Sequence, residues 1–370
     1  MKKVVILGLE RNPFNAVQYE ALREIGLDVT VIYTVSSNKV LNNTSWVAPF
    51  KSETYKTIES SRFHLNLFRN LFKRKGSVFV VYGYASWYMF ASMLVCVMLG
   101  TKYLFFTDVP IPKTRVGFFK SIVRRFAQWL AYNKSSGVLT TGKSGRKVLT
   151  SMGVHPKKII NFPYAYGSID FNRDSTIKLT NEEAFLECVH NRTIILFSSQ
   201  LIFRKGLDLL LNALVAVKKS SSFILLVEGD GPQKLFFKDL VVKLGLTNEV
   251  IFLGFNSSKQ HARYLALSDF VVSPSRWDPW GNIVSEGMSL GKAVIASEDV
   301  AAALDRITHN EDGLIYPSED TQKLSIYIEA LINDVELRER LGRNAQVASQ
   351  FWHPQRAAIS LSMYLNELPN

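Results

Sequence analysis

Cysteine is scarce in this chain of 370 residues, which contains only Cys96 and Cys188. Two cysteines so far apart are too few for a disulfide framework or a cysteine-rich zinc site, and they favour a reducing compartment such as the cytoplasm. The composition, 47% hydrophobic and 21% charged, is typical of a folded globular protein. Because the chain is about twice as long as an average domain, we expect two domains.

Metal-binding patterns are also absent from the sequence. The six histidines show no metal-ligand spacing, and no Asp-x-Asp sequence occurs. The chain has no internal repeat, no heptad array and none of the motifs that read nucleic-acid grooves or stack bases. We therefore expect no metal, no cofactor and no nucleic-acid partner.

Residues 76–101 contain no charged side chain, and 26 apolar and polar residues are enough to span a bilayer. A strand-like segment at residues 78–81, then Gly83, and a second apolar segment at residues 103–106 favour a buried β-α-β unit instead. A membrane span is the alternative. The apolar run at residues 4–9 meets Glu10 and is too short for a signal peptide, so it predicts a first β-strand.

Basic residues are concentrated in the first half of the chain. Residues 1–178 contain 26 lysines and arginines against 9 acidic residues, whereas the remainder contains 18 against 23. Such an asymmetry is typical of a surface that contacts polyanions, either nucleic acid or the anionic headgroups of a membrane.

Short apolar segments alternate with longer helical patterns, which predicts doubly wound α/β sheets. In the first half we expect strands at residues 4–7, 29–33, 79–81, 103–106 and 138–140. Residues 162–192 interrupt this rhythm and are the expected connection. A second series follows at residues 193–197, 223–227, 250–253, 270–272 and 293–296. Because open α/β sheets bind ligands beyond the carboxyl ends of their strands, function is expected in loops that follow strands.

Two motifs follow neighbouring strands of the second series. Arg204 and Lys205 lie between a strand and an amphipathic helix, where two cations suit a diphosphate; a solvated basic turn is the alternative. Gly229 and Gly231 follow the next strand. They would let the backbone approach a ligand closely, or they form a tight turn without one.

A third motif, RWDPWGNIVSEG, begins at Arg276. Asp278 lies in a loop, and a helix is expected to begin near Gly281, so that the free amides of Gly281 and Asn282 favour a phosphate or sugar oxygen. Glu286 lies on the order of 8 Å further along the helix. Asp278 and Glu286 are therefore predicted to hold two parts of one ligand rather than to act as an acid and base pair. A capping aspartate with an exposed glutamate is the alternative.

Together these motifs resemble the nucleotide-sugar half of the retaining glycosyltransferases of family four, which have the GT-B fold. The resemblance runs from Gln200 to Ala296; Asp312-Gly313 and Phe351-Trp352 resemble the family's later segments. It implies two Rossmann-like α/β domains that face each other across a cleft. The acceptor domain would comprise residues 1–172 with a C-terminal helix at residues 352–370 that crosses back to it, and the donor domain residues 173–351.

The resemblance implies transfer of a sugar, with retention, from a nucleotide-diphosphate sugar to an acceptor hydroxyl. Lys205 and Arg204 would neutralise the leaving diphosphate, Asp278 would hold the transferred sugar, and Glu286 the donor ribose. The other implied donor contacts are Gly281, Asn282, Trp280, Gln200, Gly229, Gly231, Leu253 and Gly254. Of these, Leu253 and Gly254, which belong to the motif Phe252-Leu253-Gly254, would border the base. A metal-independent mechanism that uses these cations and helix amides is the simplest expectation.

Three positions depart from the family pattern. Asp278 stands where the family has glutamate, which leaves the donor sugar open. Gln200 stands where arginine is frequent, so that Arg204 and Lys205, helped by Arg11, would carry more of the diphosphate. Many members place a histidine after a strand of the first domain; here Asp108 is the candidate polar group near the reacting carbon.

A basic amphipathic helix is expected within residues 113–134. It would lie on an anionic leaflet, or it is an ordinary surface helix whose aromatic residues pack in the core. Its basic residues are Lys113, Arg115, Lys120, Arg124, Arg125 and Lys134, and Lys73-Arg74-Lys75 adds a second cluster.

The expected partners are a nucleotide-sugar donor, a glycan or lipid-linked acceptor and an anionic membrane surface. They place the protein in polysaccharide-precursor synthesis, peripheral on the cytoplasmic face of the cell membrane. The main alternative is a catalytically inactive GT-B subunit that partners another glycosyltransferase. A GT-B epimerase or phosphorylase is a further alternative.

Overall fold

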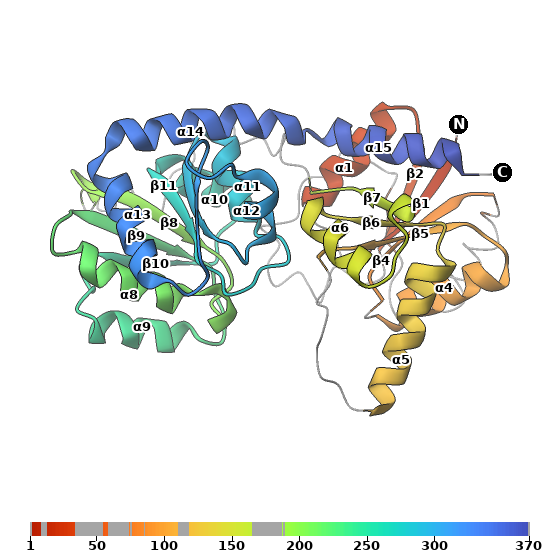
Figure 1. The fold of residues 1–370 in the computed structure, drawn as a ribbon, viewed down its shortest axis with the longest axis horizontal. Coiled ribbons are helices and arrows are strands. Elements are labelled where there is room, and N and C mark those ends of the chain that lie inside the picture. The colour runs from red at the N-terminus through yellow and green to blue at the C-terminus, as the bar shows by residue number, and fades with distance from the viewer. Residues whose placement is uncertain are drawn as a thin grey trace. The chain divides into compact units, whose positions relative to one another are not determined.

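The computed structural model describes residues 2–8, 13–33, 55–57, 74, 76–84, 86–109, 118–164, 187 and 189–368. The chain divides into two compact units, the first made of Met1–Ala165 with Trp352–Asn370 and the second of Tyr166–Phe351. Figure 1 shows a sheet with flanking helices in each unit. The predicted boundary between residues 172 and 173 and most of the predicted connection lie outside the described residues.

The first unit is built on a parallel sheet in the order β3-β2-β1-β4-β5-β6-β7. In β1, Val4 and Ile6 belong to one buried cluster, whereas Val5 and Leu7 belong to another. Because successive side chains of a strand point to opposite faces, both faces of this sheet are covered. The strands are β1 Lys3–Gly8, β2 Asp28–Tyr33, β3 Tyr55–Thr57, β4 Val78–Tyr82, β5 Tyr103–Thr107, β6 Gly137–Thr140 and β7 Ile159–Asn161.

The charge-free stretch forms the predicted β-α-β unit. β4 is followed by helix α4, Trp87–Met98, and the chain returns in β5, which pairs in parallel with β4. The side chains of Met89, Met93 and Cys96 are buried in the core. Within the described parts of the chain, no helix combines the length and the apolar character needed to cross a bilayer.

The C-terminal segment returns to the first unit as predicted. Helix α15, Pro354–Glu367, packs against α1, Pro13–Glu24, and its residues Ala357, Ala358 and Leu361 share a buried cluster with Tyr19. Figure 1 shows α15 beside α1. Among the described residues, this unit also contains α5 Phe118–Trp129, which a π-helical turn Leu130–Lys134 continues, and α6 Gly142–Ser151.

The second unit is also built on a parallel sheet, in the order β10-β9-β8-β11-β12-β13. Its strands are β8 Thr193–Ser198, β9 Phe223–Glu228, β10 Val250–Gly254, β11 Phe270–Ser273, β12 Ala293–Ser297 and β13 Leu314–Tyr316. The α-helices that the structure describes between its strands and at its end are α8 Leu207–Val217, α9 Lys234–Lys243, α10 Ser258–Leu267, α11 Asn282–Ser289, α12 Ala301–Arg306, α13 Thr321–Asn333 and α14 Val335–Ser349. Every strand that the sequence predicts is confirmed, and the short strands β3, β7 and β13 were not predicted.

Candidate functional site

The predicted ligand-binding loops gather at the carboxyl edge of the second unit's sheet. β8 lies between β9 and β11, so the direction of winding reverses beside it. Ligands of open α/β sheets bind at such a switch point because the loops on its two sides diverge there. Lys205 follows β8 and Asp278 follows β11, which places both residues at this point.

Gly206 allows the loops after β8 and β11 to approach each other. Its φ is +72°, in the left-handed region, and an added Cβ would lie 2.0 Å from the carbonyl oxygen of Pro274. The Arg276 N–H donates to the carbonyl oxygen of Arg204 at 2.9 Å. A glycine is therefore needed for the close approach that sets Arg204 and Lys205 beside the third motif.

Lys205 forms an ion pair with Asp278. The two side chains are 14% and 8% exposed, so Lys205 does not belong to a solvated basic turn. The Asp278 carboxylate accepts the Trp280 N–H at 3.3 Å, and the Asp278 main chain exchanges hydrogen bonds with Asp299 and Ala301. The carboxylate is held by the loop, whereas the flexible lysine can turn to a ligand anion. The predicted phosphate and sugar residues thus lie in contact.

Two arginines support the same pair of loops. Arg204 donates to the carbonyl oxygen of Trp277 at 2.6 Å, and its guanidinium lies 5.2 Å from the centre of that indole. Arg276 donates to both oxygens of Asp208, at 2.8 and 2.6 Å, and stacks 3.9 Å above the Phe203 ring. Sequence reasoning gave Arg276 no role. The cation that opens the third motif was its only signal, because the partner Asp208 lies far away in the sequence.

Helix α11 begins where the sequence predicts. Gly281 is its N-cap residue, with φ of +87°, and a Cβ there would lie 2.4 Å from a methyl carbon of Val300. The amides of the first turn of a helix have no intrahelical acceptor, so those near Asn282 can donate to an anion. Trp280 is only 3% exposed, and the Arg306 guanidinium lies 4.8 Å from its ring. Trp280 thus packs the base of this loop.

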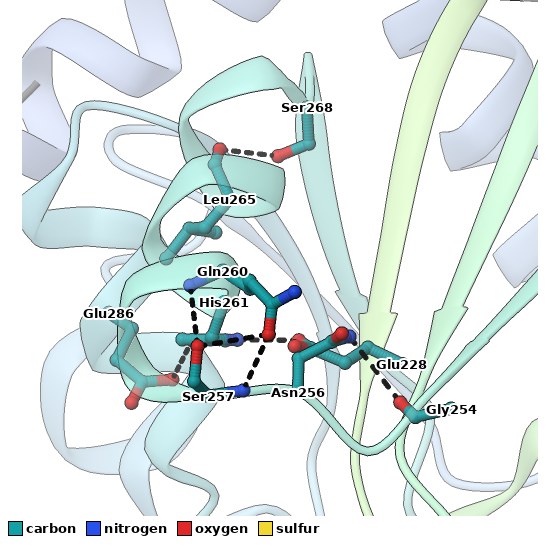
Figure 2. Close-up of polar contacts among 9 residues, drawn as sticks. All are labelled: Glu228, Gly254, Asn256, Ser257, Gln260, His261, Leu265, Ser268 and Glu286. Atoms are coloured by element: carbon teal, nitrogen blue, oxygen red, sulfur yellow. Dashed lines mark hydrogen bonds and ion pairs between the residues drawn. The ribbon is translucent and has the colours of Figure 1, made fainter. Parts of the chain in front are cut away.

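Glu286 is buried on α11 beside a second ionisable group, His261 of α10 (Figure 2). The Nε2 atom of His261 lies 3.4 Å from Glu286 Oε2, and its Nδ1 atom lies 2.5 Å from Oε2 of Glu228, the last residue of β9. The alternative of an exposed glutamate is therefore wrong. A buried carboxylate needs a partner, and here His261 supplies it.

The imidazole of His261 lies in a strongly anionic setting. Burial alone would lower the pKa of His261, but the charges of Glu286 and Glu228 outweigh burial and raise that pKa to about 10. Burial would raise the pKa of Glu228, but the charge of His261 and hydrogen bonds with Ser198 and Asn256 lower it. An imidazolium thus stands between two carboxylates at neutral pH. Sequence reasoning missed Glu228 and His261; a glutamate that ends an apolar strand was the available signal.

The remaining predicted donor contacts lie in the loops after β8, β9 and β10. Added Cβ atoms would lie 1.9 Å from the Ser199 carbonyl oxygen at Gly229 and 2.4 Å from that of Leu201 at Gly231. Loop packing alone therefore requires both glycines. The Gly229 N–H donates to the Gly254 carbonyl oxygen at 2.8 Å. Gln200 is exposed, and Leu253 and Gly254 are half-buried.

Residues 180–348 match the family model described as Glycosyl transferases group 1. The second unit belongs to this family. The match covers all the strands of this unit and every loop of the site, from Gln200 to Glu286.

Curated relatives of this glycosyl transferases group 1 unit include transferases with different substrates. The chain is 25% identical over 232 residues to alpha-D-kanosaminyltransferase of Streptomyces kanamyceticus, covering 61% of this chain and 60% of the relative. It is 22% identical over 248 residues to N-acetylgalactosamine-N,N'-diacetylbacillosaminyl-diphospho-undecaprenol 4-alpha-N-acetylgalactosaminyltransferase of Campylobacter jejuni, covering 67% and 64%. The chain thus spans less than two thirds of the length of the curated relatives it matches.

The whole chain is similar in fold to HepE of Anabaena, solved in complex with UDP. The TM-score is 0.77, with 18% sequence identity and full coverage of both chains. Together with the two parallel-sheet units, this similarity confirms the predicted GT-B fold class. The cleft between the two domains stays a prediction.

Outside the glycosyl transferases group 1 unit, Asp108 follows β5 at the carboxyl edge of the first sheet. It is half-buried and hydrogen-bonds with Tyr164. Burial, and then the charge of Asp108, raise the pKa of Tyr164 well above its ordinary value. Arg11, predicted to help with the diphosphate, lies outside the described residues.

The predicted amphipathic helix is α5 with its π-helical continuation. Phe126 and Trp129 are 43% and 39% exposed, so these aromatic residues do not pack wholly in the core. Their rings stack 5.7 Å apart, and the Lys134 amine lies 4.9 Å from the Trp129 ring. Arg125 is exposed on the same helix. The side chains of Lys113, Arg115, Lys120, Lys73 and Lys75 lie outside the described residues.

Proposed function

We propose that this protein is a retaining glycosyltransferase that transfers a sugar from a nucleotide-diphosphate donor to an acceptor hydroxyl. The observation that carries this proposal is the partly buried Lys205–Asp278 ion pair at the switch point of a glycosyl transferases group 1 unit. A cation and a carboxylate in contact suit the junction of a diphosphate with a sugar, because the first binds phosphate oxygens and the second accepts sugar hydroxyls.

In this mechanism the leaving diphosphate develops the negative charge of the transition state. Lys205 turns from Asp278 to the departing phosphate, with Arg204 beside it, and both stabilise that charge. Asp278 accepts hydrogen bonds from the sugar, and the amides of Gly281 and Asn282 bind phosphate or sugar oxygens. Glu286 accepts the ribose hydroxyls. These residues supply the needed charge without a metal, and no carboxylate acts as a nucleophile.

The remaining predicted residues have supporting places. Gln200, Gly229, Gly231, Leu253 and Gly254 line the loops that lead from the phosphate end towards the base. Trp280 packs the loop that carries Asp278. Asp108, in the first unit, is the proposed polar group near the reacting carbon, and Arg11 is proposed to assist with the diphosphate.

We assign the acceptor to the first unit and to a lipid-linked or polysaccharide-precursor glycan. The support is the basic surplus of residues 1–178, the exposed aromatic residues of α5, and a Campylobacter jejuni relative named for a diphospho-undecaprenol substrate. A basic amphipathic helix of this kind lies on an anionic leaflet. The proposed location is therefore the cytoplasmic face of the cell membrane.

A panel of UDP, GDP, ADP, CDP and dTDP, with their sugar conjugates, tests this function. We expect the nucleotides of one base to raise the melting temperature of the wild-type chain. The same nucleotides should not raise the melting temperature of Lys205→Ala. No stabilisation by any nucleotide would overturn the donor assignment. NMR of the product tests retention through its anomeric configuration, and EDTA tests metal independence. Binding without hydrolysis or transfer would favour the inactive GT-B subunit.

A further inference from the structure

Three ionisable side chains lie in a buried row in the second unit, and only one of them has a proposed contact with the donor. Glu228 ends β9, His261 lies in the first turn of α10, and Glu286 lies in α11. Figure 2 shows His261 between the two glutamates. All three are less than 5% exposed, so solvent does not screen their charges.

The row is asymmetric. Nδ1 of His261 lies 2.5 Å from Glu228, whereas Nε2 lies 3.4 Å from Glu286. Glu228 is further fixed by hydrogen bonds with Ser198 and Asn256. Glu228 is therefore the anchored end, and the longer separation at Glu286 leaves that carboxylate capacity for other donors, since a carboxylate has about four acceptor sites.

The helix that carries His261 is itself held at both ends. Ser257 and Gln260 form a capping box at its start. At its end, Ser268 Oγ donates to the Leu265 carbonyl oxygen at 2.8 Å, and Lys292 donates to those of Ala266 and Ser268 at 2.7 and 2.6 Å. His261 therefore projects from a helix that is fixed at both ends.

We propose that His261, anchored by Glu228, is a positioning residue that holds the Glu286 carboxylate in the orientation in which it binds the donor ribose. Glu228 then acts on donor binding through His261 without touching the donor. This inference rests on the proposed function, which supplies the ribose as the ligand of Glu286. The protonated form of His261 suits this position, because an imidazolium can donate hydrogen bonds to both carboxylates at once, whereas a neutral imidazole can donate to only one.

In this proposal the protonation state of His261 therefore determines whether Glu286 is held in position. The charged groups that face it are Glu286 from α11 and Glu228 from β9; the neighbouring phenol of Tyr264 on its own helix is neutral, with a pKa that burial and Glu228 raise. If His261 lost its proton, the remaining N–H would stay on Nδ1 toward Glu228. The Nε2 lone pair would then face the Glu286 carboxylate and repel it.

Glu228→Gln is the decisive variant because it keeps the shape and removes one charge. With one carboxylate fewer, burial is opposed by a single charge, so the pKa of His261 should fall by about 3 units, back towards its ordinary value, and His261 should be mostly neutral at about pH 8.5. Binding of the matching nucleoside diphosphate should weaken about 10-fold near pH 8.5, which corresponds to about 1.4 kcal/mol. It should recover to within about 2-fold near pH 6, where His261 is protonated again. KM for the donor should rise with kcat unchanged, as for uniform binding.

The measurements are calorimetric binding of UDP, GDP, ADP, CDP and dTDP at both pH values, and ring-nitrogen NMR of His261 in the full chain. Glu249→Gln is the matched control, because Glu249 pairs with Lys218 at the other end of β10 and lies outside the site. A purely structural defect in Glu228→Gln would be equal at both pH values and would overturn the proposal. A neutral His261 in the wild type near pH 8 would do the same.

Failure of the proposed function has a different signature. If wild type and control bind none of the five diphosphates, the donor assignment fails, and with it the ribose role of Glu286. If the wild type binds one of them and the loss in Glu228→Gln does not depend on pH, only the positioning role fails.

Discussion

At the scale of single residues, the ion pair of Lys205 with Asp278 gives the sharpest test of the mechanism. Lys205→Ala should lower kcat by about 10²-fold or more, because the amine stabilises charge that develops on the leaving diphosphate. Initial rates with the matching nucleotide sugar measure this. Lys243→Ala is the control, since Lys243 is an exposed lysine in the last turn of α9. Turnover near the wild-type level would remove Lys205 from the catalytic residues.

His261 predicts a pH dependence of stability. Its pKa is raised from an ordinary 6.5 to about 10, so the folded state keeps a proton that the unfolded chain releases. The stabilisation is complete below the unfolded pKa and is lost as pH rises towards the folded one, at about 1 kcal/mol per pH unit. Urea unfolding between about pH 7 and pH 9 should show this slope in the wild type. His261→Gln should lack it, and equal slopes would contradict the assignment.

The contacts of Arg276 are expected to stabilise the fold rather than to take part in the reaction. Its two hydrogen bonds with Asp208 and its stacking on Phe203 join the loops after β8 and β11. Arg276→Ala should lower the free energy of unfolding by about 2 kcal/mol, because Asp208 loses both charge-assisted bonds. Arg343→Ala, which breaks an exposed pair with Glu339, should change it little. Denaturant unfolding compares the two, and equal losses would show that the Arg276 contacts add nothing.

At the scale of elements, a comparison of Gly206 with Gly245 distinguishes the cost of a left-handed backbone conformation from the cost of steric crowding. Gly206 and Gly245 both have positive φ, +72° and +68°, but only Gly206 has a carbonyl oxygen, 2.0 Å from an added Cβ. Gly245→Ala should cost about 1 kcal/mol for its left-handed conformation alone. Gly206→Ala should cost clearly more and weaken nucleotide binding as well, because the loops after β8 and β11 must separate. Equal melting temperatures and equal binding in the two variants would contradict this account.

The same scale shows what a sequence reveals and what it does not. Strands such as β1 and β9 are apolar on both faces and were predicted within one residue of their bounds, whereas β3, β7 and β13, of three residues each, carry no usable pattern. The start of α11 was predicted from its glycine. The partner of Glu286 was not, because His261 comes from a different helix and only the folded sheet edge brings the two together.

At the scale of the whole molecule, the two units have similar folds, but the charge is distributed unevenly along the chain. Both units are parallel sheets with buried cores, yet residues 1–178 carry 26 basic against 9 acidic residues and the remainder is mildly acidic. Folding alone does not require this difference, since surface charge governs association rather than fold. It supports the proposal that the first half of the chain contacts an anionic partner.

A membrane is the partner that the exposed side of α5 favours. Phe126 and Trp129 offer apolar rings, while Arg125 and Lys134 offer positive charge on the same segment. The full chain should bind vesicles of phosphatidylglycerol at low salt, should release them as salt rises, and should ignore phosphatidylcholine, because the attraction is largely electrostatic.

Arg125→Glu should weaken vesicle binding about 10-fold or more, since each basic residue near an anionic surface contributes about 1 kcal/mol and the substitution also adds repulsion. Phe126→Ser should weaken binding at every salt concentration, because it removes apolar area rather than charge. Lys147→Glu makes the same charge change at an exposed position of α6 and should have a smaller effect. Equal losses in Arg125→Glu and Lys147→Glu would mean that net charge alone drives binding, and α5 would then have no special place on the membrane.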